Sequence, residues 1–152
     1  MTMNAVQMRS VHWVCALRAQ VNYIAFVHMY YFENTDPYVK VYMLHKHRRL
    51  DKWKSTTKKN TLSPVFNEPF EFDMTGMDVR DVCLEIFIMD HDRFRKNDVI
   101  GIVYVGLHVP SDSGTSHFNE VLSNLGQQIS HWHHLIPHQQ LKKRKRHKSN
   151  TM

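Results

Sequence analysis

Three aspartates, Asp90, Asp92 and Asp98, lie in one short run between two apolar stretches. Carboxylates this close repel one another unless a divalent cation lies among them, and Ca²⁺ takes about 6 to 8 oxygen ligands. The run is not an EF-hand, because Arg95 stands where that loop needs glycine and Gly101 where it needs glutamate. Two interpretations stay open: a calcium site, or turn residues whose carboxylates accept hydrogen bonds from backbone amides.

A second feature that could do chemistry is a basic run between positions 46 and 59. Its alternation predicts a strand over residues 52–59 in which Lys52, Lys54 and Lys58 share one face, with Lys59 following directly. A row of ammonium groups on a sheet attracts multivalent phosphate, either phosphoinositide headgroups or nucleic acid. The alternative is a solvated strand whose lysines only discourage pairing with another sheet edge.

Histidines gather near the C-terminus, at His131, His133, His134 and His138. Two histidines on one strand face supply at most half of a tetrahedral zinc site, and no cysteine lies nearby in the sequence, so we expect an exposed sheet edge. No serine lies in a nucleophile-elbow glycine pattern, and the glycines are scattered singly instead of forming a phosphate-binding loop. We therefore expect a binding protein and not an enzyme.

Charge is segregated along the chain. The 152 residues carry a formal +6, with +7 over residues 40–59, −7 over residues 60–141 and +6 over residues 142–152. This pattern predicts one surface for phosphates and another for cations, and argues against a uniformly basic nucleic-acid-binding coat. The block Lys142–Lys148 repels itself, so we expect a disordered basic tail. Nucleic-acid binding through this tail is a minor alternative, because no aromatic residues are interleaved with the basic ones.

The compartment and the relation to membranes follow from a few residues. There are two cysteines and no Asn-x-Ser/Thr sequon, which favours a reducing, cytoplasmic setting. The apolar stretch from Val11 to Phe32 approaches the length of a membrane span, but Arg18 in its middle costs about 2.5 to 3.5 kcal/mol on insertion scales. We therefore expect no span, and a chain that is soluble or peripheral to a membrane.

The elements that must position these residues are strands. From Asp36 onward, short runs of β-branched and aromatic residues are bounded by turn residues, as is typical of β proteins. One helix is expected over 116–124, with Ser116 as its cap. Strands separated by no long helix predict an all-β, mostly antiparallel sandwich. The expected strands cover residues 38–44, 52–59, 70–74, 82–88, 100–107 and 129–135.

Several motifs occur in a fixed order. Asp-Pro-Tyr-Val-Lys-Val begins at Asp36, a lysine-rich strand follows, and then come Lys-Lys-Asn-Thr-Leu-Ser-Pro-Val-Phe-Asn-Glu-Pro-Phe-Glu-Phe, Asp-x-Asp-x5-Asp-x-Ile-Gly and Trp-His-x-Leu. This order resembles the C2 domain, in particular the second C2 domain of synaptotagmins, over about 100 residues from Asp36 to Leu135. The resemblance implies an eight-stranded antiparallel sandwich that binds Ca²⁺ between loops at one end and docks on anionic membranes in regulated exocytosis.

Site residues implied by the resemblance fall into three groups. Asp90, Asp92 and Asp98 match the calcium ligands of the third loop, and Asp36 matches the second aspartate of the first loop. Lys52, Lys54, Lys58 and Lys59 match the strand that binds phosphoinositides and acidic partners, interrupted here by Trp53. Phe94 matches an apolar tip that enters the lipid, flanked by Arg93, Arg95 and Lys96.

The resemblance fails before Asn34. Tyr30 stands where the family places another aspartate, which predicts a weakened calcium site, since affinity depends on ligand charge. We expect an atypical segment over 1–33 that replaces the first strands, a C2 domain over 34–137 that is incomplete at its N-terminus, and a tail over 138–152. The expected function is calcium-influenced binding of phospholipids and phosphoinositides at a vesicle or plasma membrane. The alternative is a calcium-independent scaffold that binds SNARE or adaptor proteins.

Overall fold

The computed structural model describes residues 35–125, 127 and 129–137, together with the backbone of four short strands nearer the N-terminus. The chain forms antiparallel strands with one α-helix before the last strand, which confirms the expected all-β class. The elements are β1 (Ala5–Arg9), β2 (Val11–Val14), β3 (Arg18–Val21), β4 (Ile24–His28), β5 (Pro37–His45), β6 (Arg48–Lys54), β7 (Phe70–Asp73), the 3-10 helix η1 (Val79–Asp81), β8 (Val82–Asp90), β9 (Asp98–Gly106), α1 (Asp112–Ser123) and β10 (Ser130–His134).

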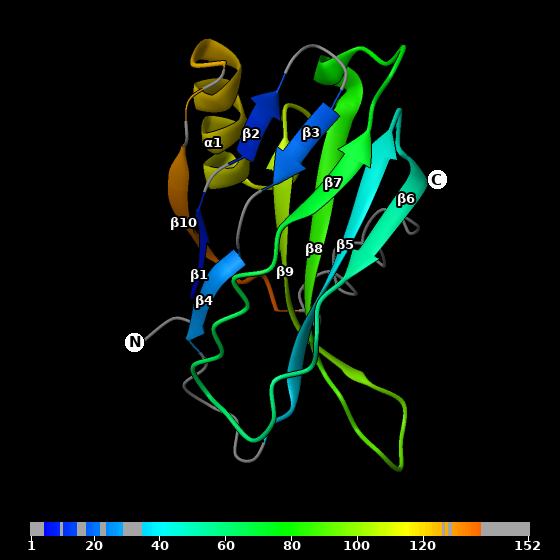
Figure 1. The fold of residues 1–152 in the computed structure, drawn as a ribbon, viewed down its shortest axis with the longest axis vertical. Helices are drawn as coiled ribbons and strands as arrows, with labels where there is room; N and C mark the ends of the chain where they lie inside the picture. Colours follow the sequence, from blue (N-terminus) through cyan, green and yellow to red (C-terminus); the bar gives the residue numbers. More distant parts are fainter. Residues whose placement is uncertain are drawn as a thin grey trace, which may run out of the picture.

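The described strands form three sheets, in the orders β6-β5-β8-β9, β2-β3-β7 and β10-β1-β4. Figure 1 shows β6 at one side of the molecule and α1 beside β10 at the other. The described chain has ten strands where eight were expected, because the N-terminal segment forms four short ones. Two of these four extend the rest of the fold, since β3 pairs with β7 and β1 pairs with β10.

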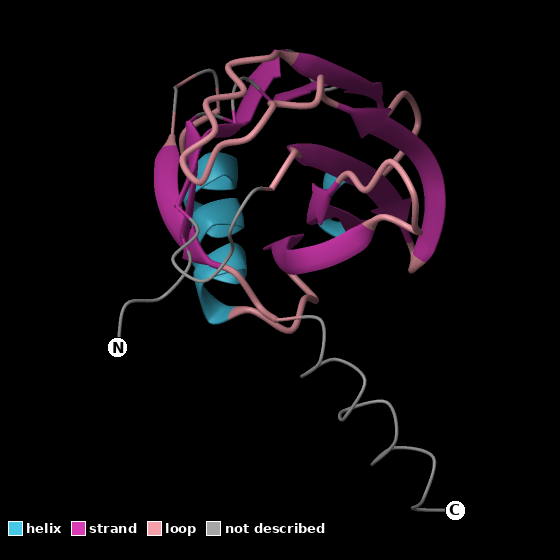
Figure 2. Cartoon of the chain, turned by 90° about the horizontal axis from the view of Figure 1, so that it is seen from below, coloured by secondary structure: helices cyan, strands magenta, loops and turns pink. Residues whose placement is uncertain are grey.

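The interior is built from alternating residues of facing strands. In β5, Val39, Val41 and Met43 are buried, and β8 buries its alternate apolar positions in the same way. The strand β7 contributes Phe70 and Phe72, and α1 closes one side of the interior (Figure 2). Each such side chain contributes roughly 1.5 to 3 kcal/mol when it is withdrawn from water, so this core holds the β5 and β8 ends in fixed positions.

The basic strand is shorter than the sequence predicts and lies further toward the N-terminus. β6 spans Arg48–Lys54, where a strand over 52–59 was expected. It ends because Ser55 turns its hydroxyl into the sheet, where Oγ accepts a hydrogen bond from the Val39 amide at 2.8 Å. Trp53 faces the interior and stacks on Phe70 with 4.6 Å between ring centroids, which explains the apolar residue inside the basic run. Lys58 and Lys59 therefore lie beyond the strand.

The helix begins earlier than expected. α1 spans Asp112–Ser123 and is capped by Ser111, whose Oγ accepts a hydrogen bond from the Gly114 amide at 3.2 Å; Ser116 lies inside the helix. Gly114 allows the helix to approach β9 closely, because a Cβ built at this position would lie 1.8 Å from the Tyr104 carbonyl oxygen. The glycine that weakens the helical pattern in the sequence is thus required by the packing.

Replacing Gly114 with alanine is expected to lower the free energy of unfolding by about 1 to 3 kcal/mol, because the added methyl group forces the helix away from the sheet. Urea denaturation measures the change. Ser116→Ala, at an exposed position of the same helix, serves as the control and is expected to change stability by less than about 0.5 kcal/mol. Equal stability of the wild type and Gly114→Ala would contradict this account of the helix contact.

Several expectations concern residues outside the described part. Tyr30, Cys15 and His138 lie outside the described residues, as does the basic block Lys142–Lys148. No helix within the described residues is long and apolar enough to cross a membrane.

The C-terminal histidines lie on an edge strand, as the sequence predicts, but they are not all exposed: β10 is the outer strand of its sheet among the described residues and His134 is exposed, whereas His133 is buried. His133 is 1% exposed and packs against His117 of α1, whose Nδ1 lies 2.9 Å from His133 Nε2. His131 also stacks on His117, with 4.5 Å between ring centroids, and its Nε2 contacts Glu120 Oε2 at 2.5 Å. The expectation of exposure is wrong for His133 because α1 packs on the face of β10 that carries this side chain.

Candidate functional site

Three of the four expected aspartates lie at the same end of the four-stranded sheet. Asp36 directly precedes β5, Asp90 ends β8 and Asp98 begins β9, and the strand register places Asp90 opposite Asp98. The Asp36 amide donates a hydrogen bond to Asp90 Oδ1 at 2.9 Å, and the His91 amide donates to the Asp36 carbonyl at 3.0 Å. Residues 54 positions apart in the sequence therefore touch at the loop end.

The loop between β8 and β9 is held by hydrogen bonds of its own side chains. Asp92 Oδ1 accepts from the amides of Phe94 at 2.7 Å and Arg95 at 3.1 Å. Asn97 braces the loop from its other side: its Oδ1 accepts from the Asp92 amide at 3.1 Å, and its Nδ2 donates to the Tyr38 hydroxyl at 2.9 Å. No local sequence pattern indicates this contact, because Asn97 and Tyr38 lie 59 positions apart in the chain.

The tip of this loop presents an apolar ring surrounded by cations. Phe94 is 95% exposed, the most exposed of the large hydrophobic side chains in the described chain. Arg93, Arg95 and Lys96 are also exposed, and within the described residues none of them forms an ion pair with a carboxylate. The loop projects at the lower end of Figure 1, away from the body of the fold.

Each oxygen of the Asp36 carboxylate accepts one hydrogen bond. Oδ2 accepts from Lys59 Nζ at 2.9 Å, and Oδ1 accepts from the Asn60 amide at 2.9 Å. These contacts, the Lys59 hydrogen bond first and the Asn60 amide second, lower the pKa of Asp36 from its usual value and keep it ionised.

Carboxylate oxygens are the donors that Ca²⁺ prefers, so the four aspartates fit this ion chemically. As the side chains stand, however, the described residues contain no group of three or more aspartates, glutamates, histidines or cysteines arranged to hold a metal. Three of the four carboxylates accept backbone amides, which is the alternative interpretation that the sequence left open.

The basic surface is carried by Lys52 and Lys54 of β6. Both are exposed, and the register places Lys54 directly opposite Lys40 of β5. Like charges opposite each other in a sheet repel, and here both ammonium groups lie over the Tyr38 ring, at 4.2 Å for Lys54 and 6.0 Å for Lys40. This arrangement keeps two positive charges together at the surface of the sheet.

The two remaining lysines of the predicted phosphate-binding set do not share this face. Lys58 Nζ lies 3.4 Å from Glu68 Oε1 and Lys59 Nζ lies 2.9 Å from Asp36 Oδ2. The prediction that Lys58 lies on one strand face with Lys52 is wrong, because the strand has ended at Lys54.

An aromatic and charged group that the sequence did not reveal lies on the same sheet. The Arg49 guanidinium lies 4.0 Å above the Tyr42 ring and 5.5 Å from the Phe87 ring. Its Nη2 also lies 2.6 Å from Glu85 Oε2, so its charge is neutralised within the sheet. Lys52 and Lys54, in contrast to Arg49, are exposed and form no ion pair with a carboxylate among the described residues.

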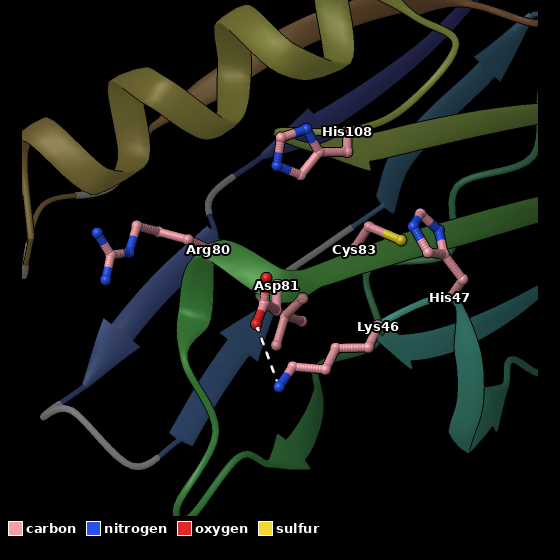
Figure 3. A pocket seen from close by; sticks show the side chains of 7 residues that line it. Lys46, His47, Arg80, Asp81, Cys83 and His108 are labelled. Atoms are coloured by element: carbon pink, nitrogen blue, oxygen red, sulfur yellow. Dashed lines mark ion pairs between the residues drawn. The ribbon is translucent and has the colours of Figure 1, made fainter.

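A small pocket lies at the opposite end of the sandwich, where β5 and β8 have their other termini (Figure 3). It is lined by Lys46, His47, Asp81, Cys83 and His108 among others, and Lys46 pairs with Asp81 at 3.8 Å. Burial raises the pKa of the Cys83 thiol to about 11, so this cysteine stays protonated and unreactive near neutral pH.

Comparison with known proteins identifies the family to which this chain belongs. The C2 domain family model matches residues 19–135, which includes the acidic loop end and the basic strand. The chain belongs to the C2 domain family. Human synaptotagmin-10 is 47% identical over 103 residues, which cover 68% of this chain and 20% of the relative. Synaptotagmin-B of Diplobatis ommata is 38% identical over 109 residues, which cover 70% of this chain and 24% of the relative.

Solved structures of C2 domains share the fold. A C2 domain of RIM from Drosophila superposes with a TM-score of 0.66 at 18% identity and covers 89% of this chain and 99% of its own. The third C2 domain of the KIAA1228 protein gives a TM-score of 0.62 at 22% identity and covers 89% of each chain. This C2 chain spans about a fifth of the length of the synaptotagmin-10 sequences that it matches.

Proposed function

We propose that this C2 domain binds anionic phospholipids and phosphoinositides in a calcium-influenced manner, as a peripheral membrane adaptor of the synaptotagmin type in vesicle trafficking and regulated exocytosis. The observation that carries the proposal is the loop tip. A 95% exposed phenylalanine flanked by exposed cations is costly in water and well suited to the boundary between headgroups and acyl chains. The proposal assigns a binding role on the cytoplasmic side of a membrane, and no catalysis.

The acidic end would hold the cation. Asp36, Asp90, Asp92 and Asp98 are the residues that would bind Ca²⁺, and the bound ion would supply positive charge that offsets the carboxylates next to the loop tip. With that repulsion reduced, Arg93, Arg95 and Lys96 would meet anionic headgroups, each contributing about 1 kcal/mol near a charged surface.

The basic strand would bind phosphate separately. Lys52 and Lys54 project from β6 into solvent, and the Lys40–Lys54 pair concentrates charge beside the Tyr38 ring. A phosphoinositide headgroup carries several negative charges and would bridge ammonium groups that otherwise repel one another.

Phe94→Ala is expected to weaken binding to vesicles of phosphatidylserine and phosphatidylcholine about ten-fold. The side chain is almost wholly exposed without a membrane, and burial of an aromatic ring contributes about 1.5 to 3 kcal/mol. Co-sedimentation at a fixed calcium concentration measures the loss. Phe94→Trp should restore binding, because tryptophan also favours the interface.

Leu125→Ala is the matched control, since Leu125 is 65% exposed but lies outside this loop. Its binding should equal that of the wild type. If Phe94→Ala also binds as the wild type does, the loop tip does not enter the lipid and the proposed docking mode is wrong.

A second candidate function is a calcium-independent scaffold that binds acidic segments of SNARE or adaptor proteins through Lys52 and Lys54. The observation that favours it is the Lys59 contact, which already neutralises Asp36 without a metal ion. Two calorimetric titrations distinguish the two candidate functions: an acidic peptide into the protein with a calcium chelator, and Ca²⁺ into the protein without the chelator. Peptide binding in the chelator, together with no heat of calcium binding, would select the scaffold.

A further inference from the structure

We propose that Lys59 is a tethered cation that competes with Ca²⁺ for Asp36 and so sets the calcium affinity of this loop end. The inference rests on the proposed calcium binding and goes beyond it, because it assigns a regulatory role to a residue that otherwise belongs to the basic segment. The contact responsible is the 2.9 Å ion pair between Lys59 Nζ and Asp36 Oδ2.

The backbone fixes Lys59 next to Asp36. After β6 ends, the chain continues along the beginning of β5: the Lys58 amide donates to the Pro37 carbonyl at 2.9 Å and the Thr61 amide donates to the Thr35 carbonyl at 3.1 Å. Thr35 Oγ1 also donates to the Thr61 carbonyl at 3.1 Å. Lys59 lies between these bonds, so its ammonium is held near the carboxylate at little further cost in backbone entropy.

Both oxygens of Asp36 are occupied in this arrangement. The Asn60 amide takes Oδ1 and the Lys59 ammonium takes Oδ2, each at 2.9 Å. An amide leaves room for a metal on the same oxygen, since a carboxylate oxygen has more than one lone pair. An ammonium does not, because its charge repels a second cation at that distance. Binding of Ca²⁺ to Asp36 therefore requires Lys59 to leave.

The strength of the contact suits tuning and not a complete block. The Lys59 side chain is 54% exposed and that of Asp36 is 21% exposed. Exposed ion pairs are weak because water and salt screen them, and their loss changes an equilibrium by about two- to five-fold. The structure thus assigns Lys59 a graded effect on calcium affinity.

The test is calcium titration by calorimetry of the wild type, Lys59→Ala and Lys59→Met at about 0.15 M salt. Both variants are expected to bind Ca²⁺ about two- to five-fold more tightly than the wild type, because Asp36 is released in each. Met keeps most of the aliphatic stem and so separates loss of charge from loss of packing. Thermal unfolding of each variant without calcium verifies that it folds.

Arg48→Ala is the control. It removes the same charge from an exposed position, but Arg48 lies opposite His45 at the far end of β5 from Asp36, forms no ion pair with a carboxylate among the described residues, and charges separated by more than about 8 Å are largely screened at this salt concentration. The calcium affinity of Arg48→Ala should match that of the wild type. An equal gain in Arg48→Ala and Lys59→Ala would overturn the inference, since net charge and not the Asp36 contact would be responsible.

Two further outcomes separate this inference from the proposed function. If the wild type binds Ca²⁺ and both Lys59 variants bind it equally well, the competition is wrong while the calcium-influenced function stands. If neither the wild type nor the Lys59 variants bind Ca²⁺, the calcium part of the proposed function fails and this inference fails with it.

Discussion

Reversing the two exposed lysine charges of β6, in Lys52→Glu/Lys54→Glu, is expected to lower the affinity for vesicles that contain phosphatidylinositol 4,5-bisphosphate by about 30-fold or more. Each lysine near an anionic surface contributes about 1 kcal/mol, and a glutamate in its place adds repulsion, so the pair accounts for at least about 2 kcal/mol. Both side chains lie in solvent, which leaves the fold intact. Vesicle titration followed by co-sedimentation measures the change.

The matched control changes the same amount of charge at the other end of the sandwich. Lys46→Glu/Arg80→Glu alters two exposed side chains beside the small pocket, far from β6's exposed lysines in the strand register. Its affinity should fall by less than about three-fold, because charges beyond a Debye length are screened. Equal losses in the two double variants would mean that binding follows net charge and that the β6 lysines form no site.

Acidification from pH 7 to pH 5 is expected to lower the free energy of unfolding by about 2 to 4 kcal/mol. Burial lowers the pKa of His117 to about 3 and that of His133 to about 4, helped by the neighbouring histidines. The unfolded chain takes up these protons below about pH 6.5, whereas the folded chain does not until about pH 4. Stability is therefore complete above pH 6.5 and is lost as the pH falls.

Urea denaturation between pH 8 and pH 4.5 measures how the free energy of unfolding changes with pH. NMR of the imidazole protons shows which histidines are protonated in the folded chain. His117 and His133 should remain neutral throughout this range, since they share a 2.9 Å hydrogen bond and stack at 5.1 Å. His108→Gln, at an exposed position, is the control and should leave the slope unchanged. Protonation of His117 or His133 in the folded chain above pH 6 would contradict the account.

Much of the fold could be predicted because local patterns agree with it. The alternation of Val39, Val41 and Met43 reappears as the buried face of β5, and acidic residues between apolar strands mark a loop end. Phe94 was expected at an apolar loop tip from its place in the C2 motif, and the structure leaves it 95% exposed. Successive side chains of a strand point to opposite faces, so an alternation of apolar and polar residues indicates the buried face without knowledge of the tertiary contacts.

The contacts that overturn predictions from the sequence join residues far apart in the chain and leave no local sequence pattern. Ser55 ends β6 by bonding to Val39, 16 positions away, although its neighbours continue the alternation of a strand. Lys59 reaches Asp36 across 23 positions, so a lysine assigned to phosphate binding lies in the acidic end instead. The buried position of His133 depends on α1 covering β10, which a count of histidines cannot reveal.

The most direct test of the central claim is binding of this chain to vesicles of phosphatidylserine, phosphatidylcholine and phosphatidylinositol 4,5-bisphosphate, with calcium and with a chelator, in the same buffer. We expect the chain to bind these vesicles in the chelator through the β6 lysines. Calcium should increase vesicle binding, because the ion offsets the negative charge of aspartates such as Asp36 and Asp98 next to the exposed Phe94. Equal binding under the two conditions would contradict the calcium-influenced mechanism. No binding to anionic vesicles under either condition would contradict the account as a whole.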